Sequence, residues 1–181
     1  MSVELIANVV GSLALLLSVW GLVRKTNDKL LIILSVSVLV WGVHYFLMNS
    51  IVGGIMHLIA AIGIFVADRM QSRGFSSRFW MASLFVALNL ITGVVWWTGH
   101  WDAYAMAAAP ILVYSQFCLK GHHMRMGFMA GEVAMFFYAS ALGSVPGMAV
   151  AMINLAAGAA GLTRMLLDNK SRVETVRSEV S

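Results

Sequence analysis

Charged residues are scarce in this chain: Asp, Glu, Lys and Arg together make up 11% of its 181 residues. A soluble domain usually carries about 25% charged residues, so this chain has too few to cover a water-facing surface. Hydrophobic residues account for 60% of the sequence, and the mean hydropathy is +0.85. We therefore expect an integral membrane protein, with the lipid bilayer as its partner.

Cysteine and proline are also rare. The single cysteine, Cys118, excludes an internal disulfide, and only two prolines interrupt the chain, which is compatible with long helices. The first apolar run is preceded by MSVEL, which contains no Lys or Arg. Because a signal peptide needs a basic segment at that point, we expect no cleavable signal.

Long apolar runs make up most of the remaining sequence, and a run of about 20 residues is long enough to cross a bilayer as a helix. Alternating strand patterns are absent, so we expect an all-α integral membrane protein with seven transmembrane helices. The expected spans are Leu5–Val23, Leu30–Met48, Ile51–Ala67, Phe79–Trp97, Ala103–Leu119, Met126–Gly143 and Pro146–Leu167.

The basic residues fall in every second connection between the expected spans, and at or after the end of the seventh span. They are Arg24, Lys25, Lys29, Arg69, Arg73, Arg78, Lys120, Arg125, Arg164, Lys170, Arg172 and Arg177. The opposite connections, Asn49-Ser50, Thr98–Asp102 and Ser144-Val145, contain none. The positive-inside rule then predicts an N-terminus outside and a C-terminus in the cytoplasm. Because this asymmetry accounts for the net charge of +4, we expect no nucleic-acid partner.

The outline of the sequence repeats around a central helix. In spans one to three and in spans five to seven, a basic connection is followed by a tight one, and the third helix begins with a small polar turn and glycine. Two such units become parallel when one linker helix separates them. We expect a first three-helix bundle in residues 1–69, a cytoplasmic loop and linker helix in 70–100, and a second bundle in 101–167. A polar cytoplasmic tail, the frayed end of a helix, follows in 168–181.

Two stretches resemble a known family: WGVHYFLMNSIVGGIMHLIAAIGIFVADR, Trp41–Arg69, and ITGVVWWTGHWDAYAMAAAPILVYSQF, Ile91–Phe117. They are similar to a bacterial inner-membrane family typified by YgjV, over most of the membrane region. The layout of three, one and three helices is more distantly similar to the SWEET and PnuC superfamily of small-solute transporters. The resemblance implies a multi-pass protein of the bacterial inner membrane, whereas fold analogy alone does not give a substrate.

Polar side chains inside the expected spans are the candidate functional groups, because they are costly in a bilayer. His44 and His57 lie on neighbouring antiparallel helices at a similar depth in the outer leaflet. Either both line a solute or proton path, or each donates to a carbonyl of a neighbouring helix and locks the helix pair. We expect no metal and no cofactor, since zinc takes about four ligands and Cys118 lies at the opposite end of its helix.

Glu132 is the only carboxylate inside an expected span. It lies about two turns, or roughly 10 Å, from the cytoplasmic end of its helix. In a cavity it would carry a proton or bind a cationic or hydroxyl-bearing solute. In the alternative interpretation it is an interfacial acid paired with Arg24, Lys25 or Arg125.

Two asparagines and a tyrosine complete the candidate solute site. Asn154 is surrounded by alanine and glycine, which permit close helix approach and leave room for a solute. SWEET-type transporters use an asparagine in the third helix of each half; Asn154 resembles the second, and the first half has His57 in that region instead. Asn89 of the linker helix either joins the site or bridges helices, and Tyr114 is a lesser candidate.

Pro110 removes one backbone hydrogen bond from its helix and is the candidate hinge, since SWEET-type transporters have a proline at a comparable place in both halves. No catalytic residue is expected, because the chain lacks an HExxH motif, a Gly-rich phosphate loop and a nucleophile with a base at helical spacing. Cys118 with His122 or His123 is the one remaining dyad, and we favour a flexible loop there.

These features favour a small-solute transporter or facilitator, with a cavity between two bundles and alternating access. Because the cavity has few charges, the solute is expected to be small and neutral or weakly cationic. The alternative is a non-transporting membrane scaffold or regulatory subunit, whose polar groups only hold helices together. The sequence leaves the oligomeric state open, a homo-oligomer included.

Overall fold

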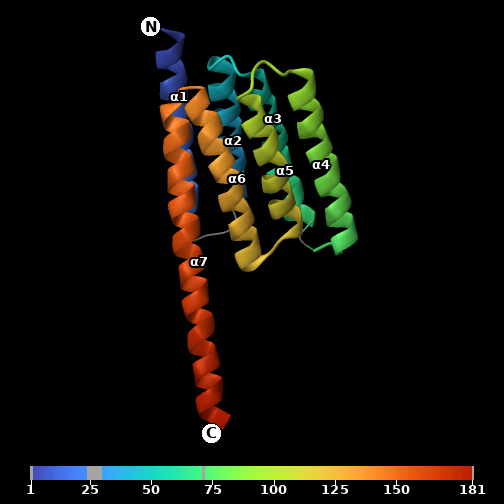
Figure 1. Cartoon of the computed structure of the whole chain (residues 1–181), viewed down its shortest axis with the longest axis vertical. Coiled ribbons are helices and arrows are strands. Elements are labelled where there is room, and N and C mark those ends of the chain that lie inside the picture. The colour runs from blue at the N-terminus through green and yellow to red at the C-terminus, as the bar shows by residue number, and fades with distance from the viewer. Residues whose placement is uncertain (1, 24–29, 71, 181) are drawn as a thin grey trace.

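A computed structural model describes residues 2–23, 30–70 and 72–180, with side chains described for 2–20, 35–70 and 72–163. Within these residues all regular structure is helical, as the sequence predicts (Figure 1). The helices are α1 (Val3–Val23), α2 (Leu30–Leu47), α3 (Ile51–Met70), α4 (Phe75–Val95), α5 (Asp102–Cys118), α6 (Gly121–Ala141) and α7 (Val145–Val180).

Over the residues whose side chains are described, four helices are long and apolar enough to cross a membrane: α1, α3, α4 and α7, over Val3–Trp20, Ile51–Met70, Phe75–Val95 and Val145–Thr163. Within the same residues the other three helices fall short for identifiable reasons. The described apolar part of α2 is only Ser35–Leu47. Helix α5 has 17 residues, and α6 contains two histidines, Arg125 and Glu132.

Helix α7 is a single helix of 36 residues that continues to Val180 and projects beyond the other helices (Figure 1). Its last part was expected as a frayed tail, because hydropathy detects only the apolar portion of a helix. The segment after Thr163 is rich in Leu, Arg, Glu and Lys, which are good helix formers, so helical backbone is compatible with its composition.

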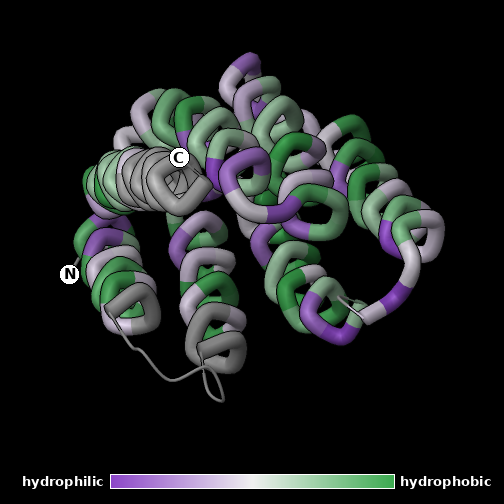
Figure 2. The backbone as a smooth tube through the Cα atoms, turned by 90° about the horizontal axis from the view of Figure 1, so that it is seen from below, coloured by the Kyte–Doolittle hydropathy of each residue, from purple (hydrophilic) through white to green (hydrophobic). Residues whose placement is uncertain are grey.

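Neighbouring helices in the chain pack side by side. Helices α1, α2 and α3 pack in chain order, and so do α5, α6 and α7. Helix α1 also packs on α7 and α3 on α5, while α4 packs on α5 and on α3. Figure 2 shows the bundle along its helices, with the helix that carries the C-terminus beside the one that begins near the N-terminus.

The buried core has two parts at different places in the bundle. One part centres on large aromatic side chains of α2 and α6: Trp41, Tyr45 and Tyr138. The other joins α3, α4 and α5 through Ala67, Ala82, Phe85, Val113, Phe117 and Cys118. The aromatic part also includes residues of α1, α3 and α5, so it lies between the helices that precede α4 and those that follow it.

The turns before α3 and before α7 have the same backbone geometry. Asn49 and Gly143 both adopt the left-handed conformation, with φ of 58° and 69°. The next residue in each turn is a serine whose hydroxyl accepts a hydrogen bond from a glycine amide at the start of the helix: Gly53 N to Ser50 Oγ and Gly147 N to Ser144 Oγ, both 3.1 Å. Each serine therefore caps its helix.

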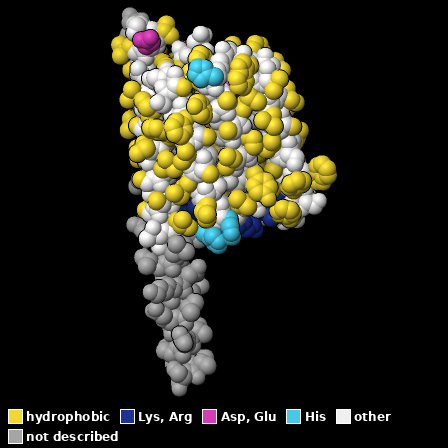
Figure 3. Space-filling model, in the orientation of Figure 1, with side chains coloured by type: hydrophobic (Ala, Val, Ile, Leu, Met, Phe, Trp, Pro, Cys, Tyr) yellow, Lys and Arg dark blue, Asp and Glu magenta, His cyan; other side chains and the backbone are white. Residues whose placement is uncertain are grey.

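The described Lys and Arg side chains lie around the α3–α4 and α5–α6 connections: Arg69, Arg73, Arg78, Lys120 and Arg125. On the face shown in Figure 3 they gather at the end of the bundle opposite the N-terminus. Arg24, Lys25 and Lys29 lie outside the described residues, as do the side chains of Arg164, Lys170, Arg172 and Arg177.

Asp102 anchors the loop before α5, at the end of the bundle where no Lys or Arg of the described residues lies. Its Oδ2 accepts hydrogen bonds from Thr98 N at 2.8 Å, Thr98 Oγ1 at 2.9 Å and Gly99 N at 3.3 Å. Its side chain is fully buried. It also stands at a helix N-terminus, where the helix dipole favours an acid.

We expect Asp102→Ala to lower the free energy of unfolding by about 2–4 kcal/mol, because three bonds to one acidic side chain are lost. The measurement is an unfolding titration in mixed micelles. Asp68→Ala is the matched control: Asp68 is an exposed acid near the end of α3, and its removal is expected to change stability by less than about 0.5 kcal/mol. Equal effects for the two variants would contradict the anchoring role.

Candidate functional site

His44 joins three helices near the end of the bundle where α2 ends and α7 begins. Its side chain is fully buried; Nδ1 lies 2.7 Å from the carbonyl oxygen of Ala7 in α1, and Nε2 lies 2.7 Å from Ser144 Oγ at the start of α7. A carbonyl only accepts, so Nδ1 carries the proton. In the neutral ring Nε2 then accepts from the Ser144 hydroxyl, whose oxygen accepts from Gly147 N.

The fit of His44 against α1 depends on a glycine. A Cβ added at Gly11 would lie 2.7 Å from His44 Nδ1 and 3.0 Å from Pro146 Cβ. The absence of a side chain there allows the imidazole to reach the Ala7 carbonyl. Close approach through small residues is a common way for membrane helices to pack.

A second hydrogen bond between a side chain and a capping serine resembles the His44–Ser144 bond, with the serine now in the N-terminal part of the chain. Tyr138 of α6 hydrogen-bonds through its hydroxyl to Ser50 Oγ at the start of α3, and both side chains are buried. His44 and Tyr138 occupy equivalent positions, since His44 lies six residues before Ser50 and Tyr138 lies six residues before Ser144. We name the four residues His44, Ser144, Tyr138 and Ser50 the serine clasp.

Tyr45 lies at the centre of the aromatic cluster beside the serine clasp. Its ring centroid is 5.1 Å from that of His44, 4.7 Å from that of His57 and 5.3 Å from that of Tyr138. The residue is 2% exposed. Within the described residues its hydroxyl has no hydrogen-bond partner, although it lies near α7, 3.2 Å from a Cβ built on Gly147.

His57 is placed differently from His44. Its Nδ1 donates to the carbonyl oxygen of Gly53, in its own helix, at 2.7 Å, and its side chain is only half-buried. The two histidines do not face each other, because the Tyr45 ring is in contact with both. His44 donates to a neighbouring helix, as the helix-locking interpretation expects, whereas His57 leaves Nε2 without a partner in the described part of the chain.

Glu132 and Asn154 meet between α6 and α7. Asn154 Nδ2 donates to Glu132 Oε1 at 2.9 Å, and both side chains are half-buried. Arg125, one of the partners considered for Glu132, lies instead against α7 at Gly161. Arg24 and Lys25 fall outside the described residues.

The remaining candidates lie apart from this group. Asn89 is buried in α4 and donates to the Phe85 carbonyl of its own helix at 2.8 Å, so this bond does not bridge helices. Tyr114 is 41% exposed. Pro110 lies within α5, and without its N–H the Met106 carbonyl has no i→i+4 donor.

The cysteine and histidines near the α5–α6 connection do not form a dyad in this structure. Cys118 is buried at the end of α5. His122 and His123 are exposed, with ring centroids 3.9 Å apart. Over the residues that the structure describes, no cluster of three or more His, Cys, Asp and Glu side chains is arranged to hold a metal.

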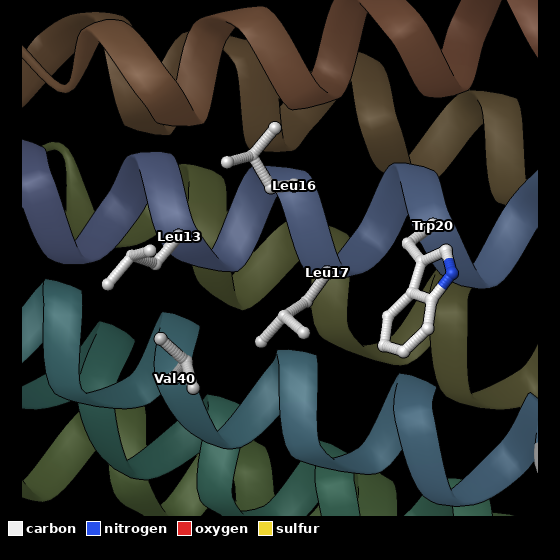
Figure 4. A pocket seen from close by; sticks show the side chains of 5 residues that line it. All are labelled: Leu13, Leu16, Leu17, Trp20 and Val40. Carbon is white, nitrogen blue, oxygen red and sulfur yellow. The ribbon is translucent and has the colours of Figure 1, made fainter.

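An apolar groove of about 430 Å³ runs along α1 and α2 at the surface. Its walls are Leu13, Leu16, Leu17, Trp20 and Val40 (Figure 4). Aliphatic side chains and an indole provide few groups to orient a polar solute. None of the polar candidates lines this groove.

Three members of the serine clasp were not among the predicted site residues: Ser50, Ser144 and Tyr138. The sequence contained one signal for them, the repeated serine with a glycine three residues later, which we interpreted only as a helix start. Nothing in the sequence indicated that these serines also bond side chains far away in the chain, 88 and 100 residues apart.

Several helices that suit a bilayer and a network of buried polar bonds between them define a multi-helix membrane protein. The chain matches the family model Imp-YgjV, described as bacterial inner membrane protein, over residues 5–169. It belongs to this family of bacterial inner membrane proteins. No match is found among curated proteins or among solved structures.

Proposed function

We propose that the chain is a small-solute transporter or facilitator that works by alternating access between two three-helix units. The serine clasp carries the proposal. It joins the units through hydrogen bonds and ring contacts at one end of the bundle, and such bonds can open and close without disturbing the internal packing of either unit. In this proposal the chain moves a solute and catalyses no reaction.

The reciprocity of the contacts supports two equivalent units, α1–α3 and α5–α7, with α4 as the linker. The first unit supplies His44 to the helix cap of the second, and the second supplies Tyr138 to the cap of the first. The helix contacts are reciprocal too, because α1 packs on α7 as α5 packs on α3. A twofold axis along the membrane normal produces this pattern, as in parallel-repeat transporters.

The polar side chains near the clasp are the proposed solute contacts. His57 and the Glu132–Asn154 pair are half-buried, in contrast to the fully closed clasp. Asn89 is proposed as a contact from the linker helix, and Pro110 as the hinge that lets α5 bend. Tyr114 is exposed in this closed arrangement and would contribute only in another conformation.

The proposed orientation places the clasp at the outer face. The basic residues gather around the α3–α4 and α5–α6 connections, whereas the clasp turns belong to the opposite connections. With the basic side inside, the N-terminus is outside and the C-terminus is in the cytoplasm. The structure then corresponds to a state closed toward the outside.

A thermal-stability screen followed by uptake tests the function. Purified protein is screened with sugars, nucleosides, vitamins and amines, and each hit is tested for uptake into proteoliposomes. Ligand at about 100 times its Kd should stabilise by about 2.7 kcal/mol. We expect Asn154→Ala to lose this stabilisation and the uptake. Uptake no faster than in empty liposomes, for every hit, would overturn transport and favour the scaffold alternative, in which His44 merely ties three helices together.

A further inference from the structure

We propose that the Glu132–Asn154 pair binds the ammonium group of a small primary amine, in exchange for a proton on the Glu132 carboxyl. The inference rests on the proposed transport function and names the class of solute. Glu132 is in the right setting for such exchange, because an isolated carboxylate in a low-dielectric interior needs a proton or a cation.

No basic side chain of the described residues supplies that cation. The Asn154 amide is the one hydrogen-bond donor to Glu132 in the described part, and it binds only Oε1. Arg125 is on the same helix, but its guanidinium lies against Gly161. One amide donor does not neutralise a carboxylate, so Oε2 remains available for a ligand.

The repeat indicates a single charge at the site. The backbone correspondence of Ser50 with Ser144 places Val38 at the position of Glu132 and Ala60 at that of Asn154. The first unit thus has neither an acid nor an amide at this level. A monocation matches one carboxyl, whereas a dication or an anion does not.

Two further acceptors that suit a donor-rich cation lie in the aromatic cluster beside the serine clasp. Tyr45 is 2% exposed, and its hydroxyl has no partner in the described residues. His57 keeps Nδ1–H on Gly53, which leaves Nε2 as an acceptor. An ammonium group has three N–H donors and is attracted to aromatic faces, so acceptors beside a tyrosine cluster match it better than they match an anion.

The exchange is balanced as a simple substitution. The amine arrives as R–NH₃⁺ at a protonated Glu132 carboxyl, and the carboxyl proton leaves to solution. The ammonium then pairs with the carboxylate, and no bond in the amine breaks. One proton is released for each amine bound, so proton release is a direct measure of the event.

The test uses ethanolamine as probe, with ethylene glycol as the uncharged match and tetramethylammonium as a cation without N–H donors. Thermal shifts at pH 7.5 are measured for the wild type, Glu132→Gln and the control Asp68→Asn, an exposed acid outside the site. Glutamine keeps an oxygen for the Asn154 amide. We expect ethanolamine alone to shift the wild type and Asp68→Asn, with at least tenfold weaker binding to Glu132→Gln.

Proton release from the wild type in weak buffer provides a measurement that needs no variant. About one proton for each ethanolamine bound supports the exchange, and binding without proton release overturns it. Three other results also overturn the proposal: a thermal shift with ethylene glycol equal to that with ethanolamine, ethanolamine binding that Glu132→Gln leaves unchanged, or no thermal shift of the wild type with ethanolamine. Uptake assays distinguish the amine proposal from the transport proposal. If a neutral solute is transported and Glu132→Gln is fully active, the transport proposal stands and the amine proposal is wrong. If the amine binds but is not taken up, the amine site stands and the transport proposal is wrong.

Discussion

Replacing His44 with alanine is expected to lower the free energy of unfolding by about 2–4 kcal/mol, mainly through the cavity left by a fully buried ring. Hydrogen bonds between membrane helices contribute only about 0.6 kcal/mol each on average, so the two bonds of His44 add a smaller part. Packing dominates because helices in lipid associate through close contact. The measurement is an unfolding titration of purified protein in mixed micelles.

His57→Ala is the matched control for this variant. His57 is on the adjacent helix and also contacts Tyr45, but it is half-buried and bonds only within its own helix. We expect it to cost about 1 kcal/mol or less. Ser144→Ala separates the contribution of the hydrogen bond from that of the cavity, because it removes one hydrogen-bond partner of His44 and leaves the imidazole ring in place. An equal loss for the two histidine variants would contradict the three-helix role of His44.

The helices themselves follow from the sequence to a large extent, because long apolar runs in a chain with few charges have few other stable forms. The boundaries were less accurate where a helix leaves the apolar region. Helix α6 begins at Gly121, before the expected Met126, and α4 at Phe75, before Phe79. The first turns of both helices contain polar or basic residues, so hydropathy does not detect them. Gly121, the first residue of α6, has a φ of 58° and therefore marks the point where the connection turns into the helix.

The site was predictable only in part. Glu132 and Asn154 were both candidates because polar groups are conspicuous in an apolar helix, but their pairing depends on how α6 rotates against α7. Tyr138 was missed because a tyrosine is unremarkable among apolar residues. Its partner Ser50 also caps α3. The sequence pattern predicts this capping role, but it does not indicate the hydrogen bond to Tyr138.

Cysteine at position 144 is expected to react with a membrane-impermeant thiol reagent added from outside, provided that the serine clasp opens. Ser144 is fully buried in the closed structure, so reaction requires separation of the two units. The variant is Ser144→Cys in a Cys118→Ala background, which removes the only native thiol. A bulky adduct should then keep the clasp from closing, and we expect uptake to fall at least tenfold after labelling.

Two further variants in the same background serve as the positive and the negative control of the labelling experiment. Asn49→Cys lies in an exposed turn and should react at once, which verifies that the reagent reaches this face. Ala108→Cys is fully buried in α5 and away from the clasp, so it should remain unreactive. If position 144 is as unreactive as position 108, the clasp stays shut and the alternating-access proposal is wrong. If position 144 reacts while position 108 does not, opening is local to the serine clasp, which is the motion that a transporter closed at this end needs and a rigid scaffold lacks.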